Sequence, residues 1–443
     1  MMKALKFTLF MMLAFNVQSL LAAVVEIGPE ENNLRTTIDA MQAGDILLLR
    51  SGDYVITSRL GVSLNCSAQQ LCVIKAKPGH SPHINRPNAN QNIMDVESSN
   101  YVLIEGIEFS GGSRGIRFTD SSYITLKNNH IHHTGDAAIT ANDIGSTYSH
   151  IKLLNNHIHD TSGTGEGMYL GCNNNGCQFD DGLIANNYIH HTNGPTVSQG
   201  DGIEIKEGSA NNTISDNVIH DTNYPCILTY ATLDSNKPNT IERNLMWGCG
   251  DHAIQSATDA VIRNNIILGA AVDGIRSQPH QNGIPDNLII THNTVFNTSG
   301  SVVRVDGIAG TVVIANNALY SQSGEAIRVS GTLNGLEVTH NVGEGSLLGI
   351  QSGFTIGNIN NDFINASYSN SLPQDVFPAM GSSLIGAASS TWLNSDDFNY
   401  YSRSGSLDVG AYLNNSEGNP SWTLSEEAKP SDVIFADGFG YEL

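Results

Sequence analysis

A short motif built around one asparagine recurs through the middle of the chain, at intervals of 21 to 31 residues. The first copies read NNHIH at 128–132 and at 155–159, and later copies keep the asparagine while the other letters vary. The conserved position of the repeat is occupied by Asn129, Asn156, Asn187, Asn217, Asn244, Asn265, Asn293, Asn317 and Asn341. A repeat of this length, with short β-branched segments, turn residues and almost no helical pattern, is typical of a parallel β-solenoid. The sequence therefore predicts an all-β fold of about 10–13 stacked coils.

The asparagine itself has a physical reason to recur. At a bend between strands, a buried side-chain amide can hydrogen-bond to the equivalent amide one coil away, about 4.8 Å along the solenoid axis. Such a ladder satisfies polar groups that would otherwise be buried without partners. We therefore expect these asparagines to be structural.

The ends of the chain differ from the repeat. Residues 1–23 combine Lys3 and Lys6 with a short apolar run and end in small residues, which is typical of a cleaved signal peptide. Residues 34–41 keep helical spacing and predict a short capping helix over the first open edge of the solenoid. We expect one β-helix domain over 24–414, with 377–414 forming its last coil and cap, and an acidic, flexible tail over 415–443.

Charge and cysteine content limit the class of protein. With 43 acidic and 21 basic residues the formal net charge is −22, which excludes nucleic acid and an anionic membrane surface as expected partners. An acidic polysaccharide remains compatible, because a local basic patch can bind what the whole surface repels. The six cysteines lie in close pairs, which favours three local disulfides in an exported, extracellular or periplasmic protein: Cys66 with Cys72, Cys172 with Cys177, and Cys226 with Cys249. We expect a monomer.

A second recurring element precedes each asparagine motif and reads, for example, GIEIK at 202–206 and CILTY at 226–230. Because side chains alternate along a strand, its third and fifth positions point outward and form two parallel columns. The first outward column runs through Arg117, Thr140, Tyr169, Glu204, Leu228, Gln255, Arg276, Arg304 and Arg328. The second places Lys206 beside Tyr230, with Gly171 on the other side expected to leave room for a sugar ring.

The repeated motifs, the opening GDILLLRSGDY at 44–54 and the ending from FPAMGSSLIGA to RSGSLDVGAY resemble right-handed parallel β-helix proteins of the pectin-lyase-like class. The resemblance covers residues 35–413 and implies the fold more strongly than the activity, since the class holds lyases, epimerases, hydrolases and adhesins. The local likeness is to secreted polysaccharide lyases of the alginate lyase and chondroitinase B type. There a lysine acts as base, an arginine on the next coil assists, and acidic residues before the lysine hold calcium. Lys206 matches that lysine, whereas Tyr230 stands where the arginine would be.

These observations predict a lyase that cleaves an acidic, uronate-containing, alginate-like glycan by β-elimination. Lys206, Tyr230 and Tyr169 are the candidate catalytic residues, because elimination needs a base and an acid near the reacting carbons. Asp201 and Glu204 are candidate calcium ligands, and calcium is the one cofactor expected. The candidate substrate-binding residues, several of which could neutralise carboxylates, are Arg276, Arg304, Arg328, Gln255 and His280.

Three other functions fit the same residues. A C5-epimerase would use nearly the same groups. A glycoside hydrolase would need two carboxylates on this face, and Asp201 with Glu204 supply them. A non-catalytic carbohydrate-binding or adhesin β-helix would need no catalytic pair.

A column of histidines also recurs in the asparagine motif, at His132, His159, His190 and His220. Four imidazoles at coil spacing raise the alternative of a metal site, but the repeat alone explains their spacing. We therefore predict a stack of surface side chains there.

Overall fold

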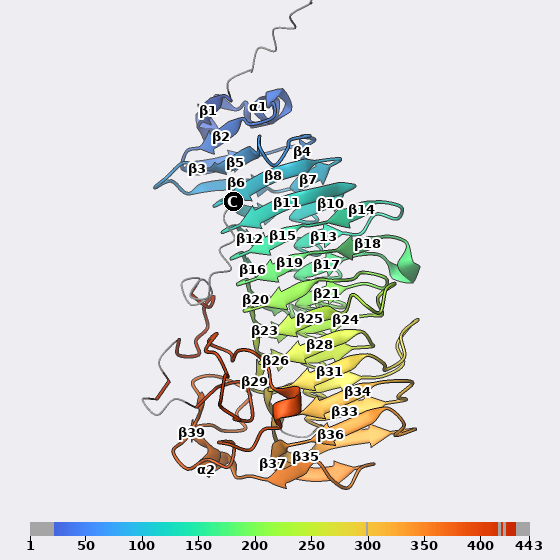
Figure 1. Cartoon of the computed structure of the whole chain (residues 1–443). Coiled ribbons are helices and arrows are strands. Elements are labelled where there is room, and N and C mark those ends of the chain that lie inside the picture. Colours follow the sequence, from blue (N-terminus) through green and yellow to red (C-terminus); the bar gives the residue numbers. More distant parts are fainter. Residues whose placement is uncertain (1–21, 298–299, 415–417, 420–421, 431–443) are drawn as a thin grey trace, which may run out of the picture.

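The computed structural model describes residues 22–297, 300–414, 418–419 and 422–430. They form a right-handed parallel β-solenoid of about 11 turns, as predicted (Figure 1). Helix α1 (Leu34–Ala40) lies at the N-terminal end and buries Leu34 and Ile38, which confirms the predicted cap. Residues 1–21 of the predicted signal peptide lie outside the described residues. No helix in the described part of the chain is long and apolar enough to cross a membrane.

Each coil contributes strands to three columns that run along the solenoid. The first column is a parallel sheet whose path runs through β1 (Val24–Ile27), β2 (Ile46–Leu49), β5 (Cys72–Ala76), β8 (Asn100–Glu105), β11 (Ser121–Lys127), β15 (Lys152–Leu154), β19 (Leu183–Ala185), β22 (Thr213–Ser215), β25 (Asn239–Glu242), β28 (Ala260–Arg263), β31 (Leu288–Thr291), β34 (Val312–Ala315) and β36 (Leu336–Thr339). Two short strands, β14 (Thr147–Ser149) and β18 (Gln178–Asp180), extend it at the side.

The second column carries the strands of the asparagine motif. It consists of β3 (Gly52–Val55), β6 (Pro82–Arg86), β9 (Glu108–Gly111), β12 (His130–His132), β16 (His157–His159), β20 (Tyr188–Thr192), β23 (Val218–Thr222), β26 (Leu245–Cys249), β29 (Ile266–Ile267), β32 (Thr294–Asn297), β35 (Ala318–Ser330), β37 (Asn341–Leu348) and β38 (Phe354–Ile356).

The third column carries the second recurring element. It consists of β4 (Leu60–Val62), β7 (Met94–Glu97), β10 (Ile116–Thr119), β13 (Ile139–Ala141), β17 (Met168–Leu170), β21 (Ile203–Ile205), β24 (Ile227–Thr229), β27 (Ile254–Ser256), β30 (Ile275–Ser277) and β33 (Val303–Asp306). The long strand β35 pairs with both β32 and β33 and so joins the second and third columns.

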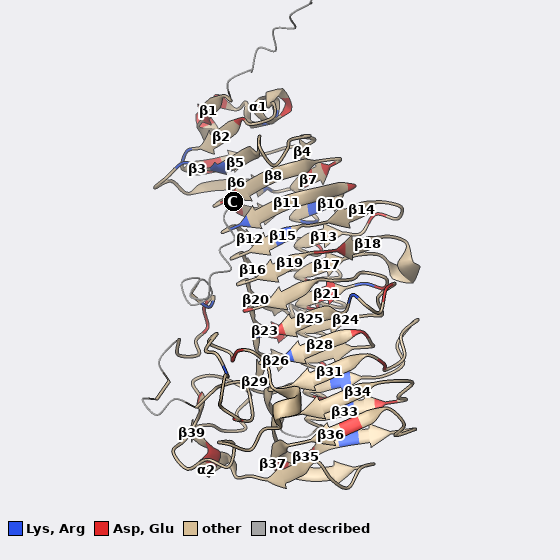
Figure 2. Cartoon of the chain, in the orientation of Figure 1, with Lys and Arg blue, Asp and Glu red and all other residues tan. Residues whose placement is uncertain are grey.

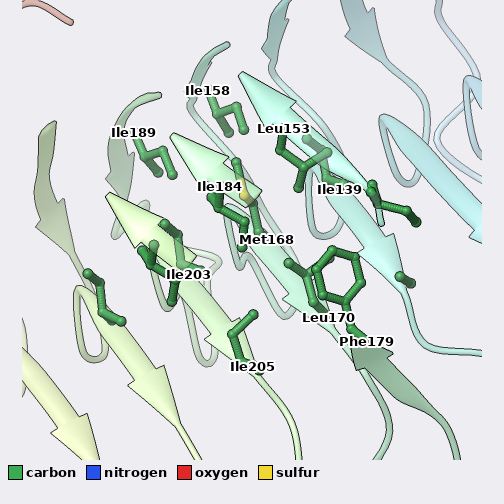
Figure 3. Packing of buried hydrophobic residues seen from close by; sticks show 14 of the residues in the cluster. Ile139, Leu153, Ile158, Met168, Leu170, Phe179, Ile184, Ile189, Ile203 and Ile205 are labelled. Atoms are coloured by element: carbon green, nitrogen blue, oxygen red, sulfur yellow. The ribbon is translucent and has the colours of Figure 1, made fainter. Parts of the chain in front are cut away.

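Aliphatic side chains fill the interior in stacked rows. Ile139, Met168 and Ile203 occupy equivalent positions on successive strands and are fully buried (Figure 3). Each such side chain contributes roughly 1.5–3 kcal/mol through removal from water. Because successive residues along a strand point inward and outward in turn, burial of these side chains fixes which of their neighbours face solvent.

The nine asparagines form the predicted ladder. From Asn129 to Asn317, the backbone N–H and the side-chain amide of each asparagine both donate to the side-chain oxygen of the next one, at 2.9–3.1 Å. The three predicted disulfides are also present: Cys66–Cys72, Cys172–Cys177 and Cys226–Cys249.

The segment after β38 does not form the expected last coil. It contains α2 (Ile359–Asp362), β39 (Phe363–Asn365) and β40 (Asp375–Pro378), and it runs back along the outside of the second column (Figure 1). Its apolar residues, among them Phe377 and Phe398, join a separate core with Trp247 and Phe296 of the solenoid strands. These strands carry apolar residues on their outer face, and that face needs a cover.

Residues 422–430, within the predicted flexible tail, are packed against the solenoid. Lys429 is buried and its Nζ lies 2.8 Å from Asp216 Oδ1, while the Lys429 carbonyl accepts a hydrogen bond from Asn186. A buried lysine needs such a charged partner, because an unpaired ammonium in the interior is costly. This part of the chain is therefore ordered, and flexibility stays a prediction for residues outside the described ranges.

Candidate active site

The third strand column presents the predicted outward side chains in register. Tyr169 of β17 pairs with Glu204 of β21, Glu204 with Leu228 of β24, and Leu228 with Gln255 of β27. The flanking residues Ile203 and Ile205 are fully buried. The alternation of the GIEIK segment thus places Glu204 on the outer face, as predicted.

A cleft of about 620 Å³ lies over these strands. Its lining includes seven of the predicted site residues: Lys206, Tyr230, Tyr169, Gln255, His280, Asp201 and Glu204. These residues come from several coils and from the loop that carries His280. The cleft is therefore built from positions that are widely spaced in the sequence.

Lys206, Tyr230 and Glu204 form a closed set of contacts at this cleft. Lys206 Nζ donates to Glu204 Oε1 at 2.9 Å and to the Tyr230 hydroxyl at 3.3 Å, and the Tyr230 hydroxyl donates to Glu204 Oε1 at 3.1 Å. All three side chains are almost fully buried. The Lys206 Nζ also lies 4.3 Å from the centre of the Tyr230 ring and 5.3 Å from that of Tyr169.

Both tyrosines are held in the protonated form. Burial raises the pKa of Tyr230 far above its usual value, and the negative charge of Glu204 adds to the rise. Burial and Glu204 raise the pKa of Tyr169 in the same way. Each hydroxyl is therefore a proton donor at neutral pH rather than a phenolate base.

Three carboxylates meet beside Lys206. Oxygen atoms of Glu166, Asp201 and Glu204 lie within 4.8 Å of one another, and all three residues are buried. Each also has one buried oxygen without a hydrogen-bond partner among the described residues: Glu166 Oε1, Asp201 Oδ1 and Glu204 Oε2. Burial, reinforced by Glu204, raises the pKa of Asp201 well above its usual value, and burial raises the pKa of Glu166 to about 7.

This cluster fits a hard divalent cation. Calcium prefers carboxylate oxygens, and the three unpartnered oxygens are the kind of donors that it binds. A bound cation would also offset the cost of burying several negative charges together. Asp201 and Glu204, the predicted calcium ligands, are thus joined by Glu166.

The arginine column is present, but it lies away from the cleft lining. Gln255, Arg276, Arg304 and Arg328 stack in register on β27, β30, β33 and β35. Arg276 is buried, and its guanidinium lies 2.6 Å from Asp306 Oδ2, which also binds Arg304 at 3.0 Å. Figure 2 shows basic (blue) and acidic (red) residues next to each other in this part of the solenoid. Arg276 and Arg304 are therefore ion-paired with Asp306 inside the protein. A role in substrate binding stays a prediction for Arg276, Arg304 and Arg328.

Several cleft residues were missed from the sequence. Arg114, Glu166 and His252 line the cleft, and each stands directly before the small residue that opens the second recurring element. Asp201 occupies the same position in its coil. Extending the aligned element by one residue would have revealed this third polar column.

The environment of Gly171 also differs from the expectation. A β-carbon at this position would lie 2.7 Å from the Ser209 hydroxyl and 3.0 Å from the Lys206 β-carbon. The glycine therefore makes room for Lys206 and Ser209 rather than for a sugar ring. Its φ of +92° also favours glycine.

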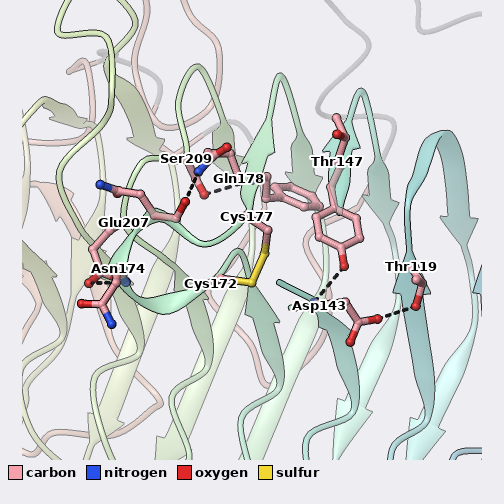
Figure 4. Close-up of a disulfide and its surroundings, with 12 residues drawn as sticks. Thr119, Asp143, Thr147, Cys172, Asn174, Cys177, Gln178, Glu207 and Ser209 are labelled. Carbon is pink, nitrogen blue, oxygen red and sulfur yellow. Dashed lines mark hydrogen bonds between the residues drawn. A yellow bond between two sulfur atoms is a disulfide. The ribbon is translucent and has the colours of Figure 1, made fainter. Parts of the chain in front are cut away.

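A disulfide-closed loop borders the site beyond Lys206. Cys172 and Cys177 close a turn whose Asn174 N–H donates to Glu207 Oε1 at 3.3 Å (Figure 4). Glu207 is fully buried although it follows Lys206 directly. The loop thus contacts the side chain of Glu207, the residue next to the candidate base.

The histidine column lies on the second strand column, and none of its four residues lines the cleft. The rings of His132, His159, His190 and His220 stack at 4.9–5.1 Å between centroids, which confirms the predicted stack. His220 is buried, however, and not at the surface as predicted. Burial is the main cause that lowers the pKa of neighbouring His157 to about 3, as it does for His190. His157 and His190 are therefore neutral at physiological pH.

Together, the fold and the cleft define a right-handed parallel β-helix protein with a polar site on one of its sheets. The family described as right handed beta helix region matches residues 35–183 and 178–310, more than half of the chain, and the chain belongs to this family. No curated protein matches the sequence.

Similar solved structures share this fold at low sequence identity. XylC, solved in complex with xylose, is 10% identical with a TM-score of 0.61, and the match covers 93% of this chain and 99% of that one. A mannuronic acid specific polysaccharide family 6 lyase from human gut microbiota is 13% identical with a TM-score of 0.51, covering 75% and 85%. Pectate lyase Pel9A is 14% identical with a TM-score of 0.50, covering 90% and 98%. At these identities the likeness shows the fold alone.

Proposed function

We propose that this protein is an exported polysaccharide lyase that cleaves an acidic, uronate-containing glycan by β-elimination. The observation that carries the proposal is the contact of Lys206 with Tyr230 at the cleft, beside a cluster of buried carboxylates. Two of the similar structures are lyases, of pectate and of a mannuronic acid polymer, which supports the same reaction class. Three disulfides are typical of an exported protein.

The reaction needs a base for the proton at C5 of a uronate and an acid for the leaving oxygen at C4. As a neutral amine, Lys206 would take the C5 proton, and the electron pair of the C5–H bond would form the C4–C5 double bond as the C4–O bond breaks. Tyr230 would then protonate the departing oxygen, because its raised pKa keeps the hydroxyl protonated. Glu204 accepts hydrogen bonds from both groups and so fixes their positions.

A carboxylate on the substrate must be neutralised for the C5 proton to become acidic enough. Arg114 lines the cleft and is half-buried beside Asp136, at 3.3 Å, so it is the arginine best placed for this role. Glu166, Asp201 and Glu204 would hold calcium, which when bound supplies further positive charge toward a substrate carboxylate.

The decisive assay incubates the protein with a panel of polyuronates and follows the ultraviolet absorbance of the unsaturated uronate formed by elimination. Lys206→Ala should lower the rate on the order of a hundredfold or more, since it removes the base. Tyr230→Phe should also impair the reaction, whereas Lys237→Ala, a change at an exposed lysine, should leave it intact. Circular dichroism of each variant checks the fold. Full activity of Lys206→Ala would refute the assignment.

One observation favours a second candidate, a glycoside hydrolase. Glu166, whose pKa of about 7 suits a general acid, lies close to Asp201 and Glu204, and paired carboxylates perform glycoside hydrolysis. New reducing ends without ultraviolet absorbance would identify this reaction. Inversion at C5 without cleavage would identify an epimerase, and binding without any reaction would identify a carbohydrate-binding module.

A further inference from the structure

A cluster of histidines lies on the second strand column and has no part in the cleft. Nine of the 15 histidines of the chain belong to it, joined by ring contacts from β6 to β23. Within it, His130, His157 and His159 each offer a ring nitrogen, and these nitrogens lie within 4.8 Å of one another. The three residues come from the adjacent strands β12 and β16, which pair in register.

The hydrogen bonds of this group fix one tautomer. His159 Nδ1 lies 2.7 Å from the Asp160 carboxylate, so it carries the proton and donates it. The Nε2 atom of His159 therefore keeps its lone pair. It points at Nε2 of His130, 2.7 Å away, while the ring of His157 stacks on that of His130 at 4.6 Å.

We propose that His130, His157 and His159 form a binding site for a divalent transition-metal cation of the zinc type, which links two adjacent coils. Imidazole nitrogens are the ligands that zinc, nickel, copper and cobalt ions share, whereas calcium and magnesium prefer oxygen. With metal–nitrogen bonds of about 2.0–2.1 Å, two ligands of a tetrahedral ion lie roughly 3.3 Å apart. The His130 and His159 nitrogens, 2.7 Å apart, need to separate by only about 0.6 Å to reach that spacing. His157 Nε2 lies 2.8 Å from His190 Nε2, and on binding its ring would exchange this contact for the ion.

Two carboxylates support a cation here. Asp160, on Nδ1 of His159, has the position of an outer partner that orients a ligating imidazole and raises its basicity. Glu108 lies 3.1 Å from His132 Nε2, and its carboxylate, His130 and His132 form a further group of closely spaced donor atoms. A bound cation would therefore meet nearby negative charge as well as three nitrogens.

The proposal is tested on the full chain without a histidine tag, titrated with Zn²⁺ and with Co²⁺ in excess Ca²⁺. Calorimetry should show one tight equivalent of Zn²⁺, and bound Co²⁺ should show the visible absorption of a tetrahedral nitrogen site. His157→Gln and His159→Gln should weaken binding by more than about 100-fold, and Asp160→Asn by about 10–100-fold, since it acts on a ligand rather than on the metal.

Two controls separate this site from others. Glu166→Gln alters the carboxylate cluster of the cleft and should leave Zn²⁺ affinity unchanged, which makes the result independent of the proposed lyase activity. His340→Asn changes an exposed histidine outside the cluster, and asparagine accepts its φ of 52°. It should also bind Zn²⁺ like the wild type.

The proposal fails if the wild type binds no Zn²⁺ in excess Ca²⁺, or if His159→Gln binds it as tightly as the wild type. Should His157→Gln or His159→Gln misfold by circular dichroism, Asp160→Asn decides, because this exposed and nearly isosteric change leaves the packing in place. Unaltered affinity in Asp160→Asn would then overturn the assignment.

Discussion

Replacing Asn217 by alanine tests how much the asparagine ladder contributes to stability. Its side-chain oxygen accepts from the backbone N–H and from the amide of Asn187, both at 2.9 Å. Its own amide donates to the Ile184 carbonyl and to the side chain of Asn244, again at 2.9 Å. The substitution removes all four hydrogen bonds in a fully buried environment.

At about 1 kcal/mol net for each hydrogen bond, the loss is about 4 kcal/mol. The Asn187 N–H and the Ile184 carbonyl are also left without their partners, and a buried unpaired polar group costs roughly 1–3 kcal/mol. For these two groups the penalty replaces the net value of the lost bond. Two bonds at about 1 kcal/mol and two unpaired groups at about 1–3 kcal/mol each therefore lower the free energy of unfolding by about 4–8 kcal/mol, a large part of the stability of an ordinary domain.

Urea denaturation followed by far-ultraviolet circular dichroism measures the change. The matched control is Asn236→Ala, in an exposed turn of a neighbouring loop, which should change stability by less than about 0.5 kcal/mol. A loss below about 1 kcal/mol for Asn217→Ala would mean that water or a shifted backbone replaces the ladder, and the reasoning from buried amides would be refuted.

Two further predictions concern ions and pH. Calcium should raise the melting temperature of the wild type, because it binds the cluster of Glu166, Asp201 and Glu204 in the folded protein only. Glu166→Gln should reduce that rise. An equal rise in both proteins would contradict calcium binding at the cluster. His292 is buried, and burial together with the positive charge of Arg403 lowers its pKa well below 6.5. Its neutral form is therefore favoured by folding, so its contribution to stability is present above pH 6.5 and is lost as the pH falls below that value. Stability curves measured between neutral and acid pH should consequently fall less steeply for His292→Asn than for the wild type, and parallel curves would contradict the assignment.

The repeat made the fold and half of the site predictable. Each coil repeats the same inward and outward pattern, so the positions of Glu204, Lys206 and Tyr230 follow from strand alternation and coil stacking alone. Glu166 was missed because the aligned element began at Gly167, one residue too late. The inward and outward alternation of the strand does not mark such a residue, because it stands at the bend before the strand. Extending the alignment to that position would have found it.

The ion-pair partners of the arginines were less predictable than the positions of the arginines on the strands. The column of Arg276 and Arg304 could be aligned from the sequence, but the direction of their guanidinium groups depends on Asp273 and Asp306, which the repeat does not specify. The segment after residue 357 has no repeat at all. Its path is set by apolar residues on the outer face of the second column, including Trp247 and Phe296, which the sequence analysis had not singled out.

The returning C-terminal segment changes how the solenoid can come apart. A stack in which each coil touches only its neighbours can unravel from one end, one coil at a time. Here Lys429 is bound to Asn186 and Asp216, and Asp396 to Arg243, so one stretch of chain holds coils that lie far from the C-terminal end of the stack. Unfolding of the coils that carry Asn186, Asp216 and Arg243 is thereby linked to release of this segment. During synthesis, these coils emerge before the segment that carries Asp396 and Lys429 has been made. They must therefore fold first as a stack of coils, and the whole chain becomes one cooperative unit only after this segment binds.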